Sequence, residues 1–354
     1  MSRFFSPKHA ALEPYVPGEQ PRDQVYIKLN TNESPFPPSP RAVEKAAEAA
    51  KGLQLYSDPE CRALKAAFAE TTGISGDKVI FTNGSDEALY LLFLAFCDDE
   101  HGAAFPALSY GFYPVYADFT HTPALPIPLK EDFSIDPADY FGLGRTVVIA
   151  NPNAPTGVAL SAAQIESIVR ANPDNVVAVD EAYVDFGGES VLPLIDKYDN
   201  LLVIQTFSKS RSLAGARLGF AAGNAALIQD LNTVKYSINP YNVNSVTEAA
   251  AIGALSDEEY TRTNCRVIAE TREWTAGQLR ALGFVTTDSV TNFLFARHPD
   301  IGGEELYLKL KERGVLIRHF SREDIKDYNR ITVGSRQQME TLIEKITGIL
   351  EERK

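Results

Sequence analysis

Short, continuous apolar runs recur between residues 79 and 223. They lie at 79–82, 146–151, 175–180, 201–207 and 217–223, and several are rich in β-branched residues. Continuous apolar runs are typical of strands that are buried on both faces of a sheet. Amphipathic segments such as 161–170 separate them, which predicts right-handed crossover helices. The pattern therefore predicts an α/β fold, in which a mostly parallel sheet is sandwiched between helices.

The segment before this pattern is rich in proline. Prolines recur from Pro7 to Pro40, and proline excludes a long helix because it lacks the backbone N–H. We expect residues 1–40 to form an extended arm. Helical patterns follow at 41–51 and again after Asp58, where an N-cap residue precedes a proline at the first helical position.

The pattern changes after about residue 256. A long charged helix is expected over 257–282, and shorter strands and helices follow it, which indicates a smaller α+β domain. We therefore predict three parts. The arm, 1–40, packs with the small domain and a partner subunit, 41–255 form a large domain, and 256–354 form the small one.

Composition excludes several classes of partner. The 354 residues include 47 acidic and 34 basic side chains, a formal net charge of −13 at pH 7. No basic stripe is visible, so nucleic acid is not an expected partner. The longest apolar run, 89–97, is about half of the roughly 20 residues that a membrane span requires, and the first residues lack the apolar core of a secretory signal. We expect a cytoplasmic protein that binds no membrane.

Cysteines and histidines do not indicate a metal site. Cys61, Cys97 and Cys265 lie far apart and form no C-x-x-C pair, so reduced core thiols are expected. The five histidines show no ligand spacing. Neither a bound metal nor a disulfide is predicted.

Chemically capable side chains follow several predicted strands. In an open parallel sheet, ligands bind outside the carboxyl ends of the strands. The run at 79–82 leads through Gly84, Ser85 and Asp86 into a helix. The free N–H groups at this helix start could bind a phosphate, although an ordinary N-cap is equally compatible. The run at 175–180 ends in Asp180, whose carboxylate could also simply be solvated, and Tyr183 follows.

A lysine follows the run at 201–207. Ser208 and Lys209 end it, and Arg217 opens the next strand. A lysine that is partly desolvated near other cations can form a Schiff base, although an isolated Ser-Lys pair is more often part of a surface salt bridge. The combination is more informative than its parts. A phosphate-binding helix start, a strand-end acid, a lysine and an arginine are the groups that a pyridoxal phosphate site needs.

Other functional classes have less support. The serine-hydrolase motif G-x-S-x-G is absent. The fragment 142–144, Gly-Leu-Gly, precedes a strand, where a dinucleotide-binding motif should follow one. A catalytically silent binding protein of the same fold is a further alternative, but binding alone needs no Schiff-base lysine.

The order of NGSDEAL, NPNAPTG, VDEAY and TFSKS…GARLGF resembles that of fold-type I pyridoxal-phosphate aminotransferases. The segments LNTNESPFPPSP, YSDPECRALKAA, SYGFYPVYA, PYNVNS and RITVGSR are similar to the histidinol-phosphate aminotransferases among them. The resemblance extends from about Tyr15 to Arg336. It implies amino exchange between L-histidinol phosphate and 2-oxoglutarate, giving imidazole acetol phosphate and glutamate in histidine biosynthesis. An aromatic-amino-acid aminotransferase, or a phosphate-directed decarboxylase of the same fold, is the alternative.

The resemblance also implies roles for individual residues. Lys209 would form the Schiff base with the cofactor and move the substrate Cα proton. Asp180 would face the pyridine nitrogen, and Tyr183 the 3-oxygen of the ring. Tyr110 would stack on the ring, with core packing as the alternative role. The remaining predicted ligands hold the cofactor phosphate: Gly84, Ser85, Asp86, Thr206, Ser208 and Arg217.

Two further cofactor contacts are expected, one across a subunit interface and one where this chain departs from the family's pattern. The resemblance places Tyr56 against the cofactor phosphate of the neighbouring subunit, which implies a homodimer with shared active sites. The family's asparagine usually stands directly before Pro-Thr-Gly, where this chain has Ala154. We expect Asn153 to take over part of its contact with the 3-oxygen.

Four residues are expected to bind the substrates. Arg318 and Arg330 match the family's anion-binding arginines, and each adjoins an apolar strand. A guanidinium binds a carboxylate or a phosphate through two hydrogen bonds, so one arginine can receive glutamate and histidinol phosphate in turn. Tyr15 and Asn32 would close the pocket from the arm.

Overall fold

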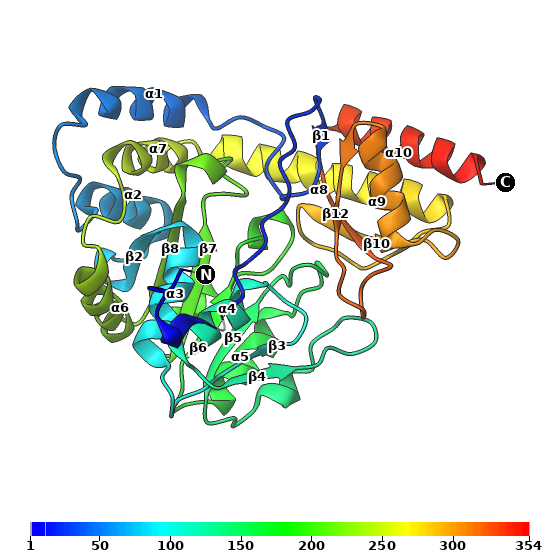
Figure 1. The fold of residues 1–354 in the computed structure, drawn as a ribbon. Helices are drawn as coiled ribbons and strands as arrows, with labels where there is room; N and C mark the ends of the chain where they lie inside the picture. Colours follow the sequence, from blue (N-terminus) through cyan, green and yellow to red (C-terminus); the bar gives the residue numbers. More distant parts are fainter. Residues whose placement is uncertain (1, 11, 354) are drawn as a thin grey trace.

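The computed structural model describes residues 2–10 and 12–353. Its central sheet contains β2 (Val79–Asn83), β3 (Ala103–Pro106), β4 (Ala124–Ile127), β5 (Thr146–Ala150), β6 (Val177–Asp180), β7 (Leu201–Thr206) and β8 (Leu218–Gly223). The strand order is β2-β8-β7-β6-β5-β3-β4 (Figure 1). Strand β8 is antiparallel to both neighbours, and the other pairs are parallel. The predicted mostly parallel α/β sheet is confirmed. The apolar pattern misses β3 and β4, of which β4 is largely exposed.

Helices cover both faces of this sheet: α1 (Pro40–Ala49), α2 (Arg62–Thr72), α3 (Gly84–Phe96), α4 (Phe112–Thr120), α5 (Ala162–Ala171), α6 (Ala225–Ile238) and α7 (Ser245–Leu255). Successive side chains of a strand point to opposite faces. Val147 and Ile149 therefore pack in the core that includes α2, α5 and α7, whereas Val148 and Ala150 pack in the core that includes α3, α4 and α6. This two-sided burial explains the continuous apolar runs.

The start of α2 differs from the prediction. The helix begins at Arg62, because Cys61 has a left-handed conformation with φ 49°. Asp58 and the proline after it lie in the preceding turn, where the Asp58 carboxylate accepts hydrogen bonds from the backbone N–H groups of Glu60 and Arg62. Asp58 therefore accepts from the first N–H of the helix, although Cys61, and not Asp58, occupies the N-cap position.

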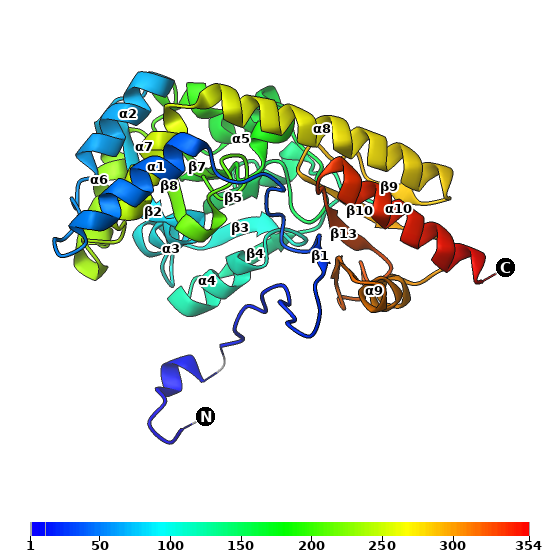
Figure 2. The ribbon, with the colours of Figure 1, turned by 90° about the horizontal axis from the view of Figure 1, so that it is seen from above.

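A second, antiparallel sheet lies beyond the long helix α8 (Glu258–Ala281). It contains β9 (Val285–Thr286), β10 (Phe293–Arg297), β12 (Arg318–His319) and β13 (Asn329–Thr332), in the order β12-β13-β10-β9. Helices α9 (Gly303–Glu312) and α10 (Arg336–Glu351) accompany it, and α8 runs across both parts of the molecule (Figure 2). The segment 315–320 is divided between two sheets. Its first part, β11 (Val315–Leu316), pairs with β1 (Ile27–Lys28) of the N-terminal segment, and β12 pairs with β13.

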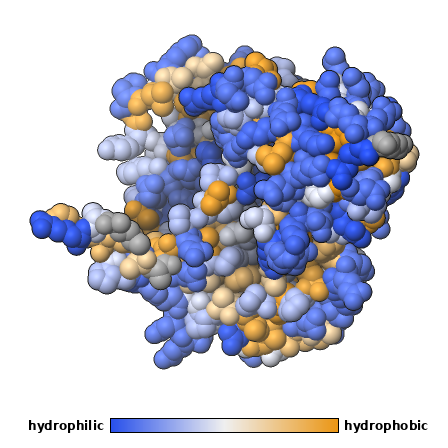
Figure 3. Space-filling model, turned by 45° about the vertical axis from the view of Figure 1, so that its right-hand side comes forward, coloured by the Kyte–Doolittle hydropathy of each residue, from blue (hydrophilic) through white to orange (hydrophobic). Residues whose placement is uncertain are grey.

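Short 3-10 helices occur in the connections: η1 (Pro7–His9), η2 (Ala50–Gly52), η3 (Gly76–Lys78), η4 (Pro137–Tyr140), η5 (Val184–Phe186), η6 (Leu192–Asp196) and η7 (Ala214–Ala216). The segment 12–26 is extended, and the N-terminal residues project from the body of the molecule (Figure 2). On the face shown in Figure 3, hydrophilic residues predominate and hydrophobic ones lie scattered among them. In the described part of the chain, no helix combines the length and apolar character needed to cross a bilayer.

Candidate active site

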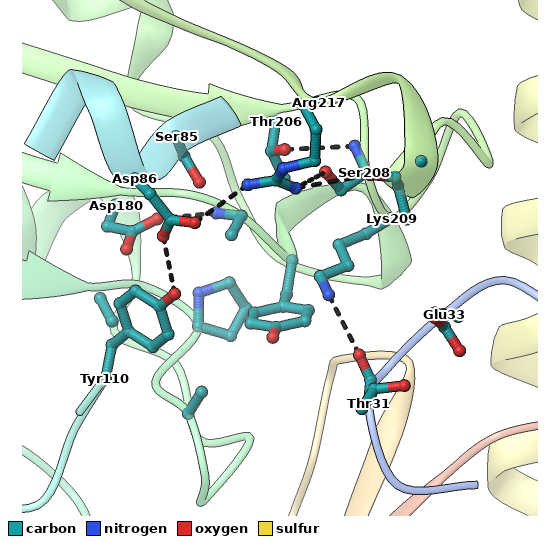
Figure 4. A pocket seen from close by; sticks show the side chains of 17 residues that line it. Thr31, Glu33, Ser85, Asp86, Tyr110, Asp180, Thr206, Ser208, Lys209 and Arg217 are labelled. Carbon is teal, nitrogen blue, oxygen red and sulfur yellow. Dashed lines mark hydrogen bonds and ion pairs between the residues drawn. The ribbon is translucent and has the colours of Figure 1, made fainter. Parts of the chain in front are cut away.

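A cavity of about 310 Å³ opens at the carboxyl end of the central sheet (Figure 4). The last residues of three neighbouring strands reach it: Ala150 of β5, Asp180 of β6 and Thr206 of β7. The surrounding connections supply the rest of the lining: Thr31, Glu33, Ser85, Asp86, Tyr110, Pro152, Ala154, Ala182, Tyr183, Ser208, Lys209, Ala214, Gly215 and Arg217. Most of the predicted cofactor ligands therefore meet at the sheet edge where parallel strands place ligands.

Close backbone packing shapes one end of the cavity for an anion. Gly84 begins α3 with a φ of 76°, and a Cβ there would lie 2.5 Å from the Arg217 guanidinium. A Cβ on Gly219 of β8 would lie 2.4 Å from the backbone nitrogen of Ser85. Both glycines thus allow the helix start, Arg217 and β8 to approach one another. Because the first N–H groups of a helix have no partner within it, Ser85 and Asp86 can offer theirs to a phosphate beside Arg217.

Two hydroxyls at the end of β7, those of Thr206 and Ser208, complete this anion site. Thr206 Oγ1 donates to the carbonyl oxygen of Leu218 at 3.2 Å and accepts from the backbone N–H of Ser208 at 3.1 Å. Ser208 Oγ lies 3.5 Å from Nη1 of Arg217. The predicted phosphate ligands therefore form one connected group around the arginine.

The side chain of Asp86 makes contacts that the sequence does not indicate. Its carboxylate lies 3.0 Å from Nη2 of Arg217 and accepts a 2.7 Å hydrogen bond from the Tyr110 hydroxyl (Figure 4). Burial, followed by the charge of Asp86, raises the pKa of Tyr110 above its usual range. The hydroxyl therefore stays protonated, and the bond fixes the Tyr110 ring at the cavity wall.

The predicted Schiff-base lysine points into the same cavity. Lys209 Nζ donates to the carbonyl oxygen of Thr31 at 3.3 Å and lies 5.8 Å from the centre of the Tyr183 ring. Glu33, also in the lining, pairs with Lys28 at 2.7 Å. Burial opposes the ionisation of Glu33, but the hydrogen bond from Lys28 and the charges of Lys28 and Lys209 outweigh it and lower the Glu33 pKa. Neither Thr31 nor Glu33 is predicted as a site residue, although both belong to the segment LNTNESPFPPSP.

Asp180 lies at the inner end of the cavity. Its Oδ2 accepts from the Tyr113 hydroxyl at 2.8 Å, and its Oδ1 accepts from the backbone N–H of Ala182 at 3.2 Å. Burial raises the pKa of Asp180 to about 6, while the hydrogen bond from Tyr113 opposes this rise. Tyr113 is a site residue that the sequence does not identify, and its only signal is its place in the segment SYGFYPVYA.

Asn32 supports Tyr183 from behind. Asn32 Nδ2 donates to the hydroxyl oxygen of Tyr183 at 3.0 Å, which leaves the hydroxyl proton free to be donated into the cavity. Asn32 is itself buried, and its Oδ1 accepts from Thr332 Oγ1 at 3.0 Å. A direct contact with the substrate, as predicted, would require Asn32 to line the cavity, and it does not. Asn32 instead orients Tyr183, which does line the cavity.

The expected cofactor contact of Asn153 is contradicted by its hydrogen bonds. Its Nδ2 donates to the carbonyl oxygen of Leu108 at 3.0 Å and to Thr156 Oγ1 at 3.1 Å, and its Oδ1 accepts from Ser109 Oγ at 2.7 Å. Both amide hydrogens are thus used within the protein, and the cavity is lined by Ala154 instead. Asn153 stabilises the turn after β5 and has no amide hydrogen to offer a cofactor oxygen.

The two predicted substrate arginines lie beside this cavity and not in its lining. Arg330 of β13 donates from Nη2 to the carbonyl oxygen of Asn30 at 3.2 Å, whereas its buried Nε has no partner among residues 2–10 and 12–353. Burial lowers the pKa of Arg330. Arg318 of β12 donates to the carbonyl oxygens of Val16 and Pro17, at 3.3 and 3.4 Å, and lines a second cavity of about 530 Å³.

The two remaining predicted residues are surface tyrosines. Tyr15 stacks on Phe112 with ring centres 4.2 Å apart, and its ring centre lies 6.3 Å from that of Tyr110, which lines the cavity. Tyr56 is 86% exposed, stacks on Tyr241 at 4.7 Å and is not part of the described lining.

Comparisons with known proteins agree with this arrangement. The family model "Aminotransferase class I and II" matches residues 24–346. The histidinol-phosphate aminotransferase of Marinomonas sp. (strain MWYL1) is 50% identical over 346 residues, which is 97% of this chain and 98% of that protein. The histidinol-phosphate aminotransferase of Brachyspira hyodysenteriae is 47% identical over 353 residues, 99% of this chain and 100% of that protein.

A solved structure has the same fold. The histidinol-phosphate aminotransferase from Sinorhizobium meliloti, in complex with pyridoxal-5'-phosphate, superposes with a TM-score of 0.88 at 24% identity and covers 99% of both chains. The family match and the full-length relatives lead to one conclusion. The chain belongs to the class I and II aminotransferase family.

Proposed function

We propose that this aminotransferase exchanges an amino group between L-histidinol phosphate and 2-oxoglutarate, forming imidazole acetol phosphate and glutamate in histidine biosynthesis. The observation that carries the proposal is 50% identity, over nearly the full length, with a histidinol-phosphate aminotransferase. The cavity supports it, because it combines Lys209, the buried carboxylate of Asp180 and an anion site at Arg217.

The cavity has the groups that pyridoxal 5'-phosphate needs. When bound, this cofactor supplies an aldehyde that carries the amino group and a ring that accepts electrons. Arg217 and the N–H groups at the start of α3 can bind its phosphate. The close approach at Gly84 leaves no room for a larger residue at this point. Tyr110 offers an aromatic face to the ring, and Tyr183 offers a free hydroxyl proton to the 3-oxygen.

Two residues handle protons in this proposal. Lys209 Nζ removes the proton from the substrate Cα, and its place in the cavity beside Tyr183 keeps it close to that atom. Asp180 remains charged and holds a proton at the pyridine nitrogen. Hydrogen bonds from Tyr113 and Ala182 stabilise this charge, which burial alone would disfavour.

We infer that the arginines bind the anionic groups of both substrates. Arg330 has an unused Nε among the described residues, and its Cζ lies 5.4 and 5.8 Å from the centres of the Phe293 and Phe320 rings. A planar guanidinium can accept a carboxylate or a phosphate in the same geometry. Arg318 would add a second positive charge, and Tyr15 would cover the bound substrate from the arm.

Kinetics and spectroscopy test the assignment. A visible chromophore should disappear on reduction with borohydride, which converts the Schiff base at Lys209 into a secondary amine and so attaches the cofactor permanently. A protein without such a chromophore would contradict the cofactor. With 2-oxoglutarate as acceptor, kcat/KM should be higher for histidinol phosphate than for phenylalanine. A large preference for phenylalanine would identify an aromatic-amino-acid aminotransferase instead.

We further propose a homodimer, in which Tyr56 of one subunit contacts the cofactor phosphate of the other. Tyr56 supports this because it is exposed, is held by stacking on Tyr241 and lies outside the lining of its own cavity. Mixing Tyr56→Ala with Lys209→Ala provides a test. A mixed dimer has one intact site only if Tyr56 serves the opposite subunit, so activity should reappear on mixing. No recovery in proven mixed dimers would refute the shared site.

The domain boundaries and the cellular location stay predictions. The two sheets have separate apolar cores, which supports a large domain over 41–255 and a small domain over 256–354. A cytoplasmic location is inferred from the sequence alone.

A further inference from the structure

Tyr113 and Asp180 form a buried pair behind the cavity. Tyr113 lies in the first turn of α4, is 0% exposed and donates its hydroxyl to Asp180 Oδ2 at 2.8 Å. Its ring meets Tyr110 edge-on, with centroids 5.8 Å apart, and contacts Phe105 at the same distance. Its backbone N–H donates to the Tyr110 carbonyl at 3.2 Å. These contacts hold the hydroxyl against the carboxylate.

In this pair Tyr113 donates the hydrogen bond and Asp180 accepts it, as a charged carboxylate requires. A buried carboxylate takes up a proton unless hydrogen bonds stabilise its charge. Burial raises the pKa of Asp180 to about 6, and the bond from Tyr113 is the largest of the effects that oppose this. Burial and then the Asp180 charge raise the pKa of Tyr113 well above its usual value. The Tyr113 hydroxyl therefore remains a donor at every pH at which Asp180 titrates.

We propose that Tyr113 is a positioning residue that keeps Asp180 charged and aims its carboxylate at the cofactor's ring nitrogen. The inference rests on the proposed function, because it needs a bound ring with a basic nitrogen. Each Asp180 oxygen accepts one hydrogen bond from the protein, from Tyr113 or from Ala182. The two bonds fix the carboxylate plane and leave other lone pairs for a donor in the cavity.

The other titratable and charged groups near the pair are unchanged in Tyr113→Phe, so a change in the pH dependence of cofactor binding can be assigned to the lost hydroxyl. Asp86 of α3 acts on Asp180 through its charge and raises the Asp180 pKa. Tyr110 and Tyr183 act on Tyr113 in the same way. These three groups remain when only the Tyr113 hydroxyl is removed, and so do Lys209 and Arg217 in the cavity lining. A difference between the wild type and Tyr113→Phe then reports the lost hydroxyl.

Tyr140→Phe is the matched control. Tyr140 is 1% exposed, and its hydroxyl has no hydrogen-bond partner in the described part of the chain. Each protein is freed of cofactor, its fold is checked by thermal unfolding, and the Kd for pyridoxal phosphate is measured from about pH 6 to about pH 8. In Tyr113→Phe, Kd should rise on the order of tenfold at the acidic end. The difference should shrink at higher pH, where Asp180 ionises without help. Tyr140→Phe should match the wild type throughout.

A second comparison separates positioning from packing. Because Tyr113 acts through the carboxylate, adding Tyr113→Phe to Asp180→Asn should leave Kd unchanged. This comparison can still be made if Tyr113→Phe alone folds poorly. The Asp180→Asn variant has no buried carboxylate charge at this position, so it does not need the Tyr113 hydroxyl as a hydrogen-bond donor.

Two results would overturn the inference. One is an equal Kd for the wild type and Tyr113→Phe across the pH range. The other is an effect that persists in full in the Asp180→Asn background. If the wild type itself does not bind pyridoxal phosphate, the proposed function fails and the inference fails with it. If the wild type binds normally and Tyr113→Phe is indistinguishable from it, only the inference fails.

Discussion

Adding one methyl group at Gly219 should disable the phosphate site without changing any side chain in it. A Cβ there would lie 2.4 Å from the backbone nitrogen of Ser85 and 2.6 Å from the carbonyl carbon of Gly84, whereas ordinary contact begins at 3.4 Å. Both neighbours are backbone atoms, so no side-chain rotation relieves the contact. Strand β8 and the start of α3 must separate by about 1 Å, a displacement large enough to disrupt a catalytic site.

The expected loss follows from the hydrogen bonds of the helix start. A hydrogen bond to a charged group contributes about 1.5–3 kcal/mol, so withdrawing one N–H donor from the phosphate should raise the Kd for pyridoxal phosphate roughly 10- to 150-fold. The assay is titration of cofactor-free Gly219→Ala with pyridoxal phosphate, followed by absorbance. Thermal unfolding of the same sample establishes that the variant is folded.

Gly223→Ala is the matched control in the same strand. Its Cβ would lie 2.9 Å from the carbonyl oxygen of Leu201 and 3.2 Å from Leu202 Cδ1. It therefore crowds β8 beside β7 and not at the cavity. Both variants should unfold at a lower temperature than the wild type, but only Gly219→Ala should lose cofactor affinity. A folded Gly219→Ala with the wild-type Kd, or an equal loss in Gly223→Ala, would refute the reasoning.

Three further predictions concern single groups. Lys209→Ala should abolish transamination while the protein stays folded, and appreciable residual turnover would contradict its assignment as the base. Asp180→Ala should sharply slow removal of the substrate Cα proton, because an unprotonated ring nitrogen accepts electrons poorly, and a normal single-turnover rate would reject this. Burial raises the pKa of Glu181 from its ordinary 4.5 to about 7. Between pH 4.5 and pH 7 the unfolded chain therefore loses this proton more readily than the folded protein, and the free energy of unfolding falls as pH rises. Above pH 7 the loss reaches about 3 kcal/mol. Glu181→Gln should therefore gain stability over the wild type as pH rises through this range, and parallel pH profiles in denaturant unfolding would contradict the assignment.

Part of the site follows from the sequence because parallel strands bring their carboxyl ends to one edge. Asp180 ends β6, and β7 pairs with it in parallel register, so Thr206 and Lys209 must emerge nearby. Arg217 precedes β8, which runs antiparallel, and its start therefore reaches the same edge. The apolar runs indicate these strands, and the polar residues that end them can be read directly.

The remaining contacts join segments that are distant in the sequence. Tyr113 meets Asp180 across 67 positions, and the carbonyl of Thr31 meets Lys209 across 178. Local periodicity carries no information about such pairs, because their geometry depends on how whole elements pack. The surroundings of Arg318 could not be predicted from the local sequence either. It adjoins an apolar strand as expected, yet that segment divides between two sheets and leaves the arginine in a neighbouring cavity.

By itself, the sequence determined that β2, β5, β6, β7 and β8 are strands and in what order the reactive groups follow them, since apolar patterning and strand-end residues are local properties. Only the tertiary structure decided which polar groups remain available to a ligand. Asn153 and Lys209 both lie just beyond a strand, but the amide hydrogens of Asn153 are used by Leu108 and Thr156 while the Lys209 ammonium reaches the cavity. The physical reason is that a buried polar group must find its hydrogen-bond partners when the elements pack, and those partners are contributed by the whole fold.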